Sequence, residues 1–276
     1  MKFVRAQPNK RAVCVELGVN RSTIYYKSRR KPDELESLVM QIFKKHLSNY
    51  GSRRIKQELA KQGILISKKR ICNILKKNDL EPKYGRRKLA RNIHTNKDER
   101  YIAENLTLNK KPTTSNHTVH TDFTEFKCSD GKLFVSGIID AFDRRVVIKC
   151  AERATKELVI DTLKLLKKPP KILHSDRGPQ YTSTLLRDYC IKENIKRSMS
   201  APYCSCQNAL IESFWKTLKI EVGETKHRSK KELKMVLKYQ INYYNNERMH
   251  SSIGYHTPVE FFTLYGVNPI QTKESA

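Results

Sequence analysis

Two carboxylates, Asp176 and Glu212, stand out because a short apolar run ends at the first and a helix-periodic run carries the second. Residues 171–175 follow two prolines and are too few for a helix, so they predict a strand that ends at Asp176. A third carboxylate, Asp122, lies inside another β-rich run. Such oxygen ligands suit magnesium or manganese, and two ions roughly 3.5 to 4 Å apart can hold the attacking and leaving oxygens of a phosphodiester.

The helix that carries Glu212 is predicted from Asn208 onward, because apolar residues recur there at helical spacing. Glu212 shares a second stripe with Lys216 and Lys219, which lie four and seven residues further on. The carboxylate is therefore expected at the rim where the core face meets solvent. The apolar stripe consists of Ile211, Phe214, Trp215, Leu218 and Val222.

From Thr118 onward the chain alternates β-rich and helical runs, which indicates an α/β fold on a mixed five-stranded sheet with flanking helices. If the first and fourth strands are neighbours, Asp122 and Asp176 come together and the Glu212 helix can close over them. The strands are expected at 118–126, 133–139, 145–150, 171–175 and 195–199, and the helices at 155–166, 183–193 and from 208.

The chain before this core is predicted to form small all-α units of the helix-turn-helix type. A helix-turn-helix-like segment is expected at 1–32 and a basic helical DNA-binding domain at 33–80. Residues 81–116 are basic and poor in large apolar residues, which predicts a linker, with a short helix near 97–104. The core then spans 117–276 and includes a C-terminal helical extension.

The charge of the chain points to a polyanionic partner. Lys and Arg number 55 against 28 Asp and Glu, a net +27, and 29 of the basic but only 10 of the acidic residues lie in 1–111. Nucleic acid is favoured over a membrane, since no interfacial helix, spanning segment or signal-peptide core is present in the sequence. The alternative is a solvated basic surface. Phosphate contacts are expected from Arg53, Arg54, Lys68, Lys69 and Arg70.

Six stretches spread over nearly the whole chain share the pattern of one family. They are 50–55, 69–71, 121–124, 174–181, 208–219 and 243–258. In these stretches the chain resembles the transposase encoded by the second reading frame of bacterial insertion sequences, of the type with a retroviral-integrase-like DDE core. Two positions depart from the pattern: Val119, where relatives often have Trp, and Gln207, where they commonly have Asp.

The resemblance implies an RNase H-like integrase catalytic core in which Asp122, Asp176 and Glu212 bind two Mg²⁺ (or Mn²⁺) ions. It implies strand cleavage and strand transfer at element ends, with double-stranded DNA of the ends and of the target as partners. A homo-oligomer on DNA is expected, and so is the upstream-frame protein or a frameshift fusion with it. The expected location is the bacterial cytoplasm, at the nucleoid, with no membrane partner.

Further residues are expected around this triad. His174 and Asn208 would support the carboxylates without binding metal, although a hydrogen-bonded core histidine is an equal alternative for His174. Lys216 and Lys219 would contact the DNA end, or else be exposed helix lysines. The rival to an enzyme is a catalytically inactive DNA-binding regulator, which the presence of all three carboxylates disfavours. A host RNase H-like nuclease is disfavoured by the long basic N-terminal portion.

Overall fold

The computed structural model describes residues 10–16, 18, 34–84, 102–108, 112–201 and 204–266. Of the predicted helix-turn-helix segment only α2 (Lys10–Glu16) and Gly18 are described. The rest of that segment, and most of the predicted linker with its short helix, lie outside the described residues. Within the described part, no helix is long and apolar enough to cross a membrane.

The core is built on a mixed five-stranded sheet, as predicted. Its order is β3-β2-β1-β4-β5, in which β1, β2 and β3 pair antiparallel while β4 pairs parallel with both β1 and β5. The first and fourth strands are therefore neighbours. The strands are β1 (Thr118–Cys128), β2 (Gly131–Asp140), β3 (Val146–Ala151), β4 (Ile172–Ser175) and β5 (Lys196–Met199).

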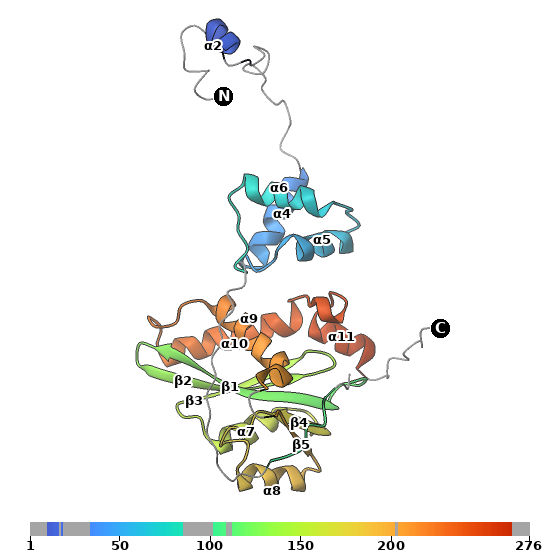
Figure 1. Cartoon of the computed structure of the whole chain (residues 1–276), viewed down its shortest axis with the longest axis vertical. Helices are drawn as coiled ribbons and strands as arrows, with labels where there is room; N and C mark the ends of the chain where they lie inside the picture. Colours follow the sequence, from blue (N-terminus) through green and yellow to red (C-terminus); the bar gives the residue numbers. More distant parts are fainter. Residues whose placement is uncertain are drawn as a thin grey trace, which may run out of the picture.

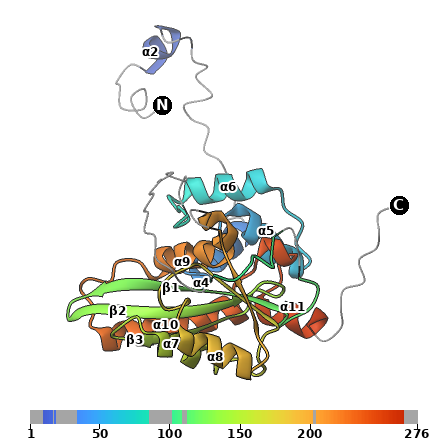
Figure 2. The same ribbon diagram turned by 60° about the horizontal axis from the view of Figure 1, so that its bottom comes forward.

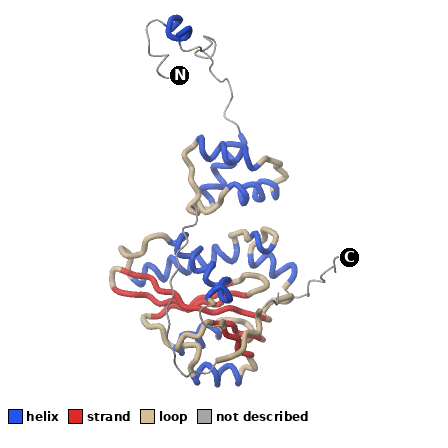
Figure 3. Tube along the Cα trace, viewed as in Figure 1, coloured by secondary structure: helices blue, strands red, loops and turns tan. Residues whose placement is uncertain are grey.

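Helices cover both faces of this sheet (Figures 1 and 3). Helices α7 (Lys156–Leu163) and α8 (Thr184–Lys192) lie on one face, and each begins after a hydroxyl side chain that accepts a backbone N–H of its first turn. On the other face lie α9 (Ala209–Val222), α10 (Lys230–Asn246) and α11 (Pro258–Tyr265). Every residue of the predicted apolar stripe on α9 is buried, which confirms that stripe as the packing face.

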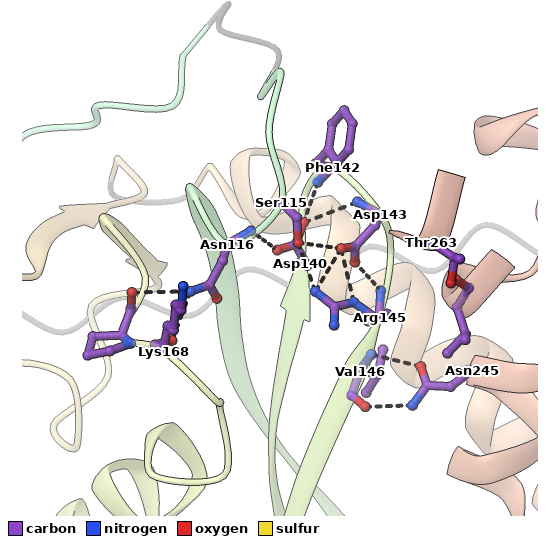
Figure 4. A network of polar contacts seen from close by, with 12 residues as sticks. Ser115, Asn116, Asp140, Phe142, Asp143, Arg145, Val146, Lys168, Asn245 and Thr263 are labelled. Carbon is purple, nitrogen blue, oxygen red and sulfur yellow. Dashed lines mark hydrogen bonds and ion pairs between the residues drawn. The ribbon is translucent and has the colours of Figure 1, made fainter. Parts of the chain in front are cut away.

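A hydrogen-bond network connects the segment just before β1 with the end of β2 and with the segment before β4 (Figure 4). The Asp140 carboxylate accepts the backbone N–H of Asn116 at 2.6 Å, and the Asn116 amide donates to the carbonyl oxygen of Lys168 at 2.8 Å. Asp143 accepts Arg145 Nε at 3.0 Å in the same network. Asn116 thus joins the end of β2 to the segment before β4, which favours one register between β1 and β4.

The basic helical domain consists of α4 (Glu34–Lys45), α5 (Ser52–Lys61) and α6 (Lys68–Lys77), packed on the α9–α11 side of the core (Figures 1 and 2). Its apolar cluster includes Met249 and, at its edge, Tyr255 from the core. The Tyr50 hydroxyl donates to the Glu247 carbonyl at 3.1 Å and accepts the Met249 N–H at 3.0 Å. The helical domain is therefore docked on the core through apolar packing and through hydrogen bonds between the Tyr50 hydroxyl and the core backbone.

A buried ion pair lies at this junction. Arg248 Nε donates to Glu221 Oε1 at 2.8 Å, and their side chains are only 5% and 1% exposed. Gln240 donates to the other Glu221 oxygen at 2.6 Å. The Tyr84 hydroxyl, from the segment that follows α6, donates to Glu221 Oε1 and accepts from Arg248. One carboxylate thus joins α9, α10 and the helical domain.

Replacing Arg248 with Met should lower the free energy of unfolding by about 3 to 5 kcal/mol, because Glu221 would be left charged and buried without its partner. The matched variant Lys132→Met breaks the exposed pair between Lys132 and Glu125 and should cost less than about 1 kcal/mol. Urea unfolding of both variants measures the difference. Equal losses in the two would show that the buried pair adds nothing beyond a surface pair.

Candidate active site

Asp122 and Asp176 are brought to one place by strand pairing. The parallel register pairs Thr118 with Ile172 and His120 with His174. Asp122 follows His120 by two residues, and Asp176 follows His174 by two residues, just past the end of β4. Because side chains alternate along a strand, Asp122 points to the sheet face that α9 covers. The Asp176 carboxylate also accepts the N–H of Gly178 at 2.9 Å, which holds it at the strand end.

Glu212 lies in the first turn of α9, and its side chain is exposed at the rim of the sheet, as predicted. The Trp215 ring packs directly on Gly137 of β2, where an added Cβ would lie 2.5 Å from the ring. Gly137 is the strand partner of Asp122. The absence of a side chain at Gly137 therefore lets α9 approach the middle of the sheet. The contact is made by Trp215, which lies about one helical turn after Glu212. A glycine inside a β-rich run was the available sequence signal.

The three carboxylates influence one another electrostatically. Burial, and then the charge of Asp176, raise the pKa of Asp122 to about 7, and Glu212 adds to the same effect. Burial and Asp176 raise the pKa of Glu212, and burial raises that of Asp176. Within the described residues, however, no three His, Cys, Asp or Glu side chains already form a group that could hold a metal ion.

His174 is held as a core histidine. Its Nδ1 lies 2.9 Å from Ser198 Oγ and its Nε2 lies 3.1 Å from Ser200 Oγ. Burial, and then the neighbouring His120, lower its pKa to about 4, so the ring is neutral at pH 7. Both ring nitrogens face serine hydroxyls, and no hydrogen bond between His174 and a carboxylate is found in the described part. This geometry favours the second of the two predicted roles.

Asn208 connects the start of α9 to β1 beside Asp122. Its Oδ1 lies 3.0 Å from His120 Nδ1, and its Nδ2 donates to the Thr121 carbonyl at 3.2 Å. His120 was missed by the sequence analysis, although it lies two residues before Asp122 and so on the same strand face. Nearby, Gln207 accepts the N–H of Ala201 and the amide of Asn105, both at 2.7 Å. Gln207 therefore acts as a structural acceptor.

The predicted DNA-contacting residues are divided between two regions. Lys216 and Lys219 are exposed on α9, on the stripe that carries Glu212. Lys68, Lys69 and Arg70 begin α6, which lies on the side of the helical domain turned away from the core, so they do not join the carboxylates (Figures 1 and 2). Arg53 is exposed, whereas Arg54 donates its Nε to the Met249 carbonyl at 3.0 Å.

The raised pKa of Asp122 predicts a pH-dependent loss of stability. When the folded-state pKa exceeds the ordinary value of 3.8, protonation stabilises the fold, and this contribution disappears as the pH rises through about 7. In EDTA, Asp122→Asn should nearly match the wild type near pH 4 and be more stable by roughly 4 kcal/mol at pH 8. Urea unfolding at both pH values measures this, with the exposed Asp188→Asn as control. A pH-independent difference would contradict it.

Gly137→Ala should displace Trp215 and cost about 1 to 3 kcal/mol, because the new methyl group would overlap the ring. Trp215 is the only tryptophan in the chain, so its fluorescence emission reports the displacement directly. The control is Ser136→Ala, at the adjacent position of the same strand. Unchanged emission and stability in Gly137→Ala would mean that α9 does not depend on this contact.

Comparison with known proteins agrees with this architecture. The family described as "Integrase core domain" matches residues 112–205 and again 193–258, and the "HTH-like domain" family matches residues 31–100. The solved structure of a simian T-cell lymphotropic virus intasome, in complex with PP2A regulatory subunit B56 gamma, matches with a TM-score of 0.50 and 16% identity. The match covers 80% of this chain and 73% of that one. This likeness concerns the fold, which is RNase H-like.

Relatives are found over nearly the full length. The insertion element IS600 31 kDa protein of Shigella sonnei is 31% identical over 92% of this chain and 98% of its own length. The transposase for insertion sequence element IS904 of Lactococcus lactis is 30% identical over 82% of this chain and 92% of its own length. Because these relatives are at least 30% identical over most of their length, this chain, with its HTH-like and integrase core domains, belongs to the family of insertion-sequence transposases.

Proposed function

We propose that this transposase cleaves DNA strands at the ends of its element and joins them to target DNA, with Asp122, Asp176 and Glu212 as its catalytic carboxylates. The observation that carries the proposal is that three separate elements present these carboxylates close enough to affect one another's pKa. Structural ion-pair networks also perturb pKa values, but these three are all acidic and none of them forms an ion pair among the described residues. An all-acidic group of this kind is suited to a cationic ligand.

The three carboxylates would hold two divalent cations, Mg²⁺ or Mn²⁺. Their oxygen donors fit hard cations, and the repulsion that raises the pKa of Asp122 would be relieved by positive charge. When bound, such ions stabilise charge on the attacking and leaving oxygens of a phosphodiester. To bind a cation, the Asp122 carboxyl must lose the proton that burial otherwise favours. The side chains must also draw closer than they lie here.

The remaining residues would position the site and the DNA. Asn208 and His120 hold the first turn of α9 next to β1, so they would fix the distance between Glu212 and Asp122. Lys216 and Lys219 would contact backbone phosphates of the DNA end next to Glu212. On the helical domain Arg53, Arg54, Lys68, Lys69 and Arg70 would contact further phosphates.

The same proposal sets the partners. Each chain carries one carboxylate triad, whereas an element has two ends, so we propose a homo-oligomer assembled on double-stranded DNA of both ends and of the target. The upstream-frame protein, alone or as a frameshift fusion, would add a further DNA-binding region. With DNA as its substrate, the protein would act at the nucleoid in the bacterial cytoplasm.

Asp176→Asn should abolish cleavage of element-end DNA in Mg²⁺, a loss of at least about 100-fold, because an amide supplies no ligand charge. Binding to the same DNA should change by less than about 2-fold, since this residue lies away from the basic helical domain. Cleavage is measured on labelled duplexes that carry the end sequence.

The control is Asp188→Asn, which changes an exposed carboxylate on α8 that pairs with its neighbour Arg187 and should leave cleavage unchanged. Cleavage by Asp176→Asn at the wild-type rate would overturn the assignment of the triad. If the unmodified chain and its fusion are both inactive on cognate ends with both metals, the chain is instead the DNA-binding regulator.

A further inference from the structure

An open cleft of about 460 Å³ lies where the helical domain meets the core, apart from the carboxylate site. One wall comes from the loop before α5 and the first turn of that helix. The other wall comes from the segment after α6 and from the loop around the short helix η2 (Ser251–Ile253). The lining residues include Arg53, Arg54, Tyr84, Ser251 and Tyr255. Both domains therefore contribute to a single recess.

The charged side chains that line this cleft are both positive. Arg53 and Arg54 are the charged residues among those that line it. Within the described part neither forms an ion pair, and the nearby Arg248 is already paired with Glu221. Burial, and then the charge of Arg248, lower the pKa of Arg54. An anion in the cleft would offset this repulsion.

The geometry of Arg54 suits such an anion. Its Nε is held by the Met249 carbonyl at 3.0 Å, and its two terminal nitrogens make no hydrogen bond with any residue that the structure describes. A guanidinium fixed at one nitrogen loses little further freedom when the others bind. Planar guanidinium groups bind phosphate oxygens through paired N–H bonds.

Two further groups face the cleft without using their hydrogen-bonding capacity. Gly51, the N-cap of α5, supplies no side-chain cap, and its carbonyl accepts the Arg54 N–H at 3.0 Å, so the N–H groups of Ser52 and Arg53 are left for another acceptor. Asn49 is only 1% exposed and lines the cleft. Its amide lies close to the Tyr243 hydroxyl, yet neither amide atom forms a hydrogen bond of ordinary geometry. Both amide atoms are shielded from solvent, so Asn49 forms a polar but closed part of the cleft wall.

We propose that this cleft binds a backbone phosphodiester of DNA, so that one strand contacts the helical domain and the core together. The cleft has room for a sugar-phosphate unit but not for the width of a duplex, and hydroxyls of Ser52, Ser251 and Tyr255 line it as further donors. The inference rests on the proposed action of this transposase on DNA ends, and it adds a site that lies outside the carboxylate triad.

The cleft is also connected to the catalytic helix. Tyr84 lines it, and the Tyr84 hydroxyl donates to Glu221 in the last turn of α9. Glu212 lies in the first turn of the same helix. A phosphate in the cleft would therefore hold the DNA strand, the helical domain and α9 in one arrangement. The docking of the helical domain on the core would in this way help to position the DNA.

The test uses the full chain and a labelled 30-bp duplex of arbitrary sequence, in EDTA, so that no cleavage is needed. Arg53→Gln with Arg54→Gln should weaken binding about 10-fold near 150 mM salt and reduce the slope of log affinity against log salt by about 1 to 2. Lys192→Gln with Lys196→Gln removes the same charge from exposed positions of α8 and β5 and should have a smaller effect. Equal effects of the two pairs would overturn the proposal.

A second pair of variants tests the cleft by steric blocking and leaves every charged residue unchanged. Ser251 lines the cleft and the adjacent Ser252 does not, and both side chains are exposed. Ser251→Trp should fill the cleft and weaken duplex binding by about 5- to 10-fold, whereas Ser252→Trp should change it by less than about 2-fold. Wild-type binding by Ser251→Trp would show that the arginines act only through the general positive field. This pair decides the question even if the Arg54 variant fails to fold.

Amide hydrogen exchange distinguishes DNA from a free anion as the ligand. The peptide that spans residues 49–55 should be protected by the duplex in the wild type but not in Ser251→Trp. Inorganic phosphate at 10 mM, on the order of physiological concentrations, should protect it much less. Equal protection by phosphate alone would overturn the assignment to DNA. Because metal and cleavage are absent from these measurements, their failure would leave the carboxylate triad untouched.

Discussion

The packing of the Trp215 ring on the bare backbone of Gly137 is the contact on which the arrangement of the three carboxylates depends. It brings α9 closer to the centre of the sheet than any side chain at Gly137 would permit. Since Gly137 pairs with Asp122, the same contact sets the height of Glu212 above that carboxylate. Asn208 adds two hydrogen bonds at the start of the helix and so fixes its position along β1.

The other end of α9 serves the junction with the helical domain. There the buried Glu221 carboxylate is bonded to Arg248, Gln240 and Tyr84, which come from three different segments. Burying such a charge is costly unless each partner is in place, so the network favours one arrangement of the two domains. A single helix therefore carries Glu212, one of the three proposed catalytic carboxylates, at its start and contacts the HTH-like helical domain at its end.

Charge is distributed unevenly between the N-terminal part of the chain and the core. Most of the basic excess lies in residues 1–111, while the core gathers three carboxylates around β1, β4 and α9. Burial, and then the charge of Asp176, raise the pKa of Asp122 to about 7. The basic helical domain and the exposed lysines of α9 can hold a polyanion beside a negatively charged site that would otherwise repel it.

Much of the fold was predictable because short-range sequence patterns determine its helices and strands. The apolar stripe of α9, the proline-bounded strand before Asp176 and the order of strands and helices follow from side-chain periodicity and from breakers, which act within a few residues. The insertion-sequence transposase family was also indicated by motifs in the sequence, and the comparisons confirm it. The same motifs led to the proposal of the three carboxylates as catalytic residues.

Only the tertiary structure decided which distant residues meet. The pairing of β1 with β4 joins residues more than 50 positions apart, and its register is supported by Asn116 and Asp140, whose role no periodicity indicates. Arg54 appeared to be one more basic surface residue, yet docking of the helical domain turns its Nε to the Met249 carbonyl and leaves its other nitrogens to a cleft. Local sequence sets what each segment can form. Close packing between segments, which depends on the shape of both surfaces at once, sets where its side chains act.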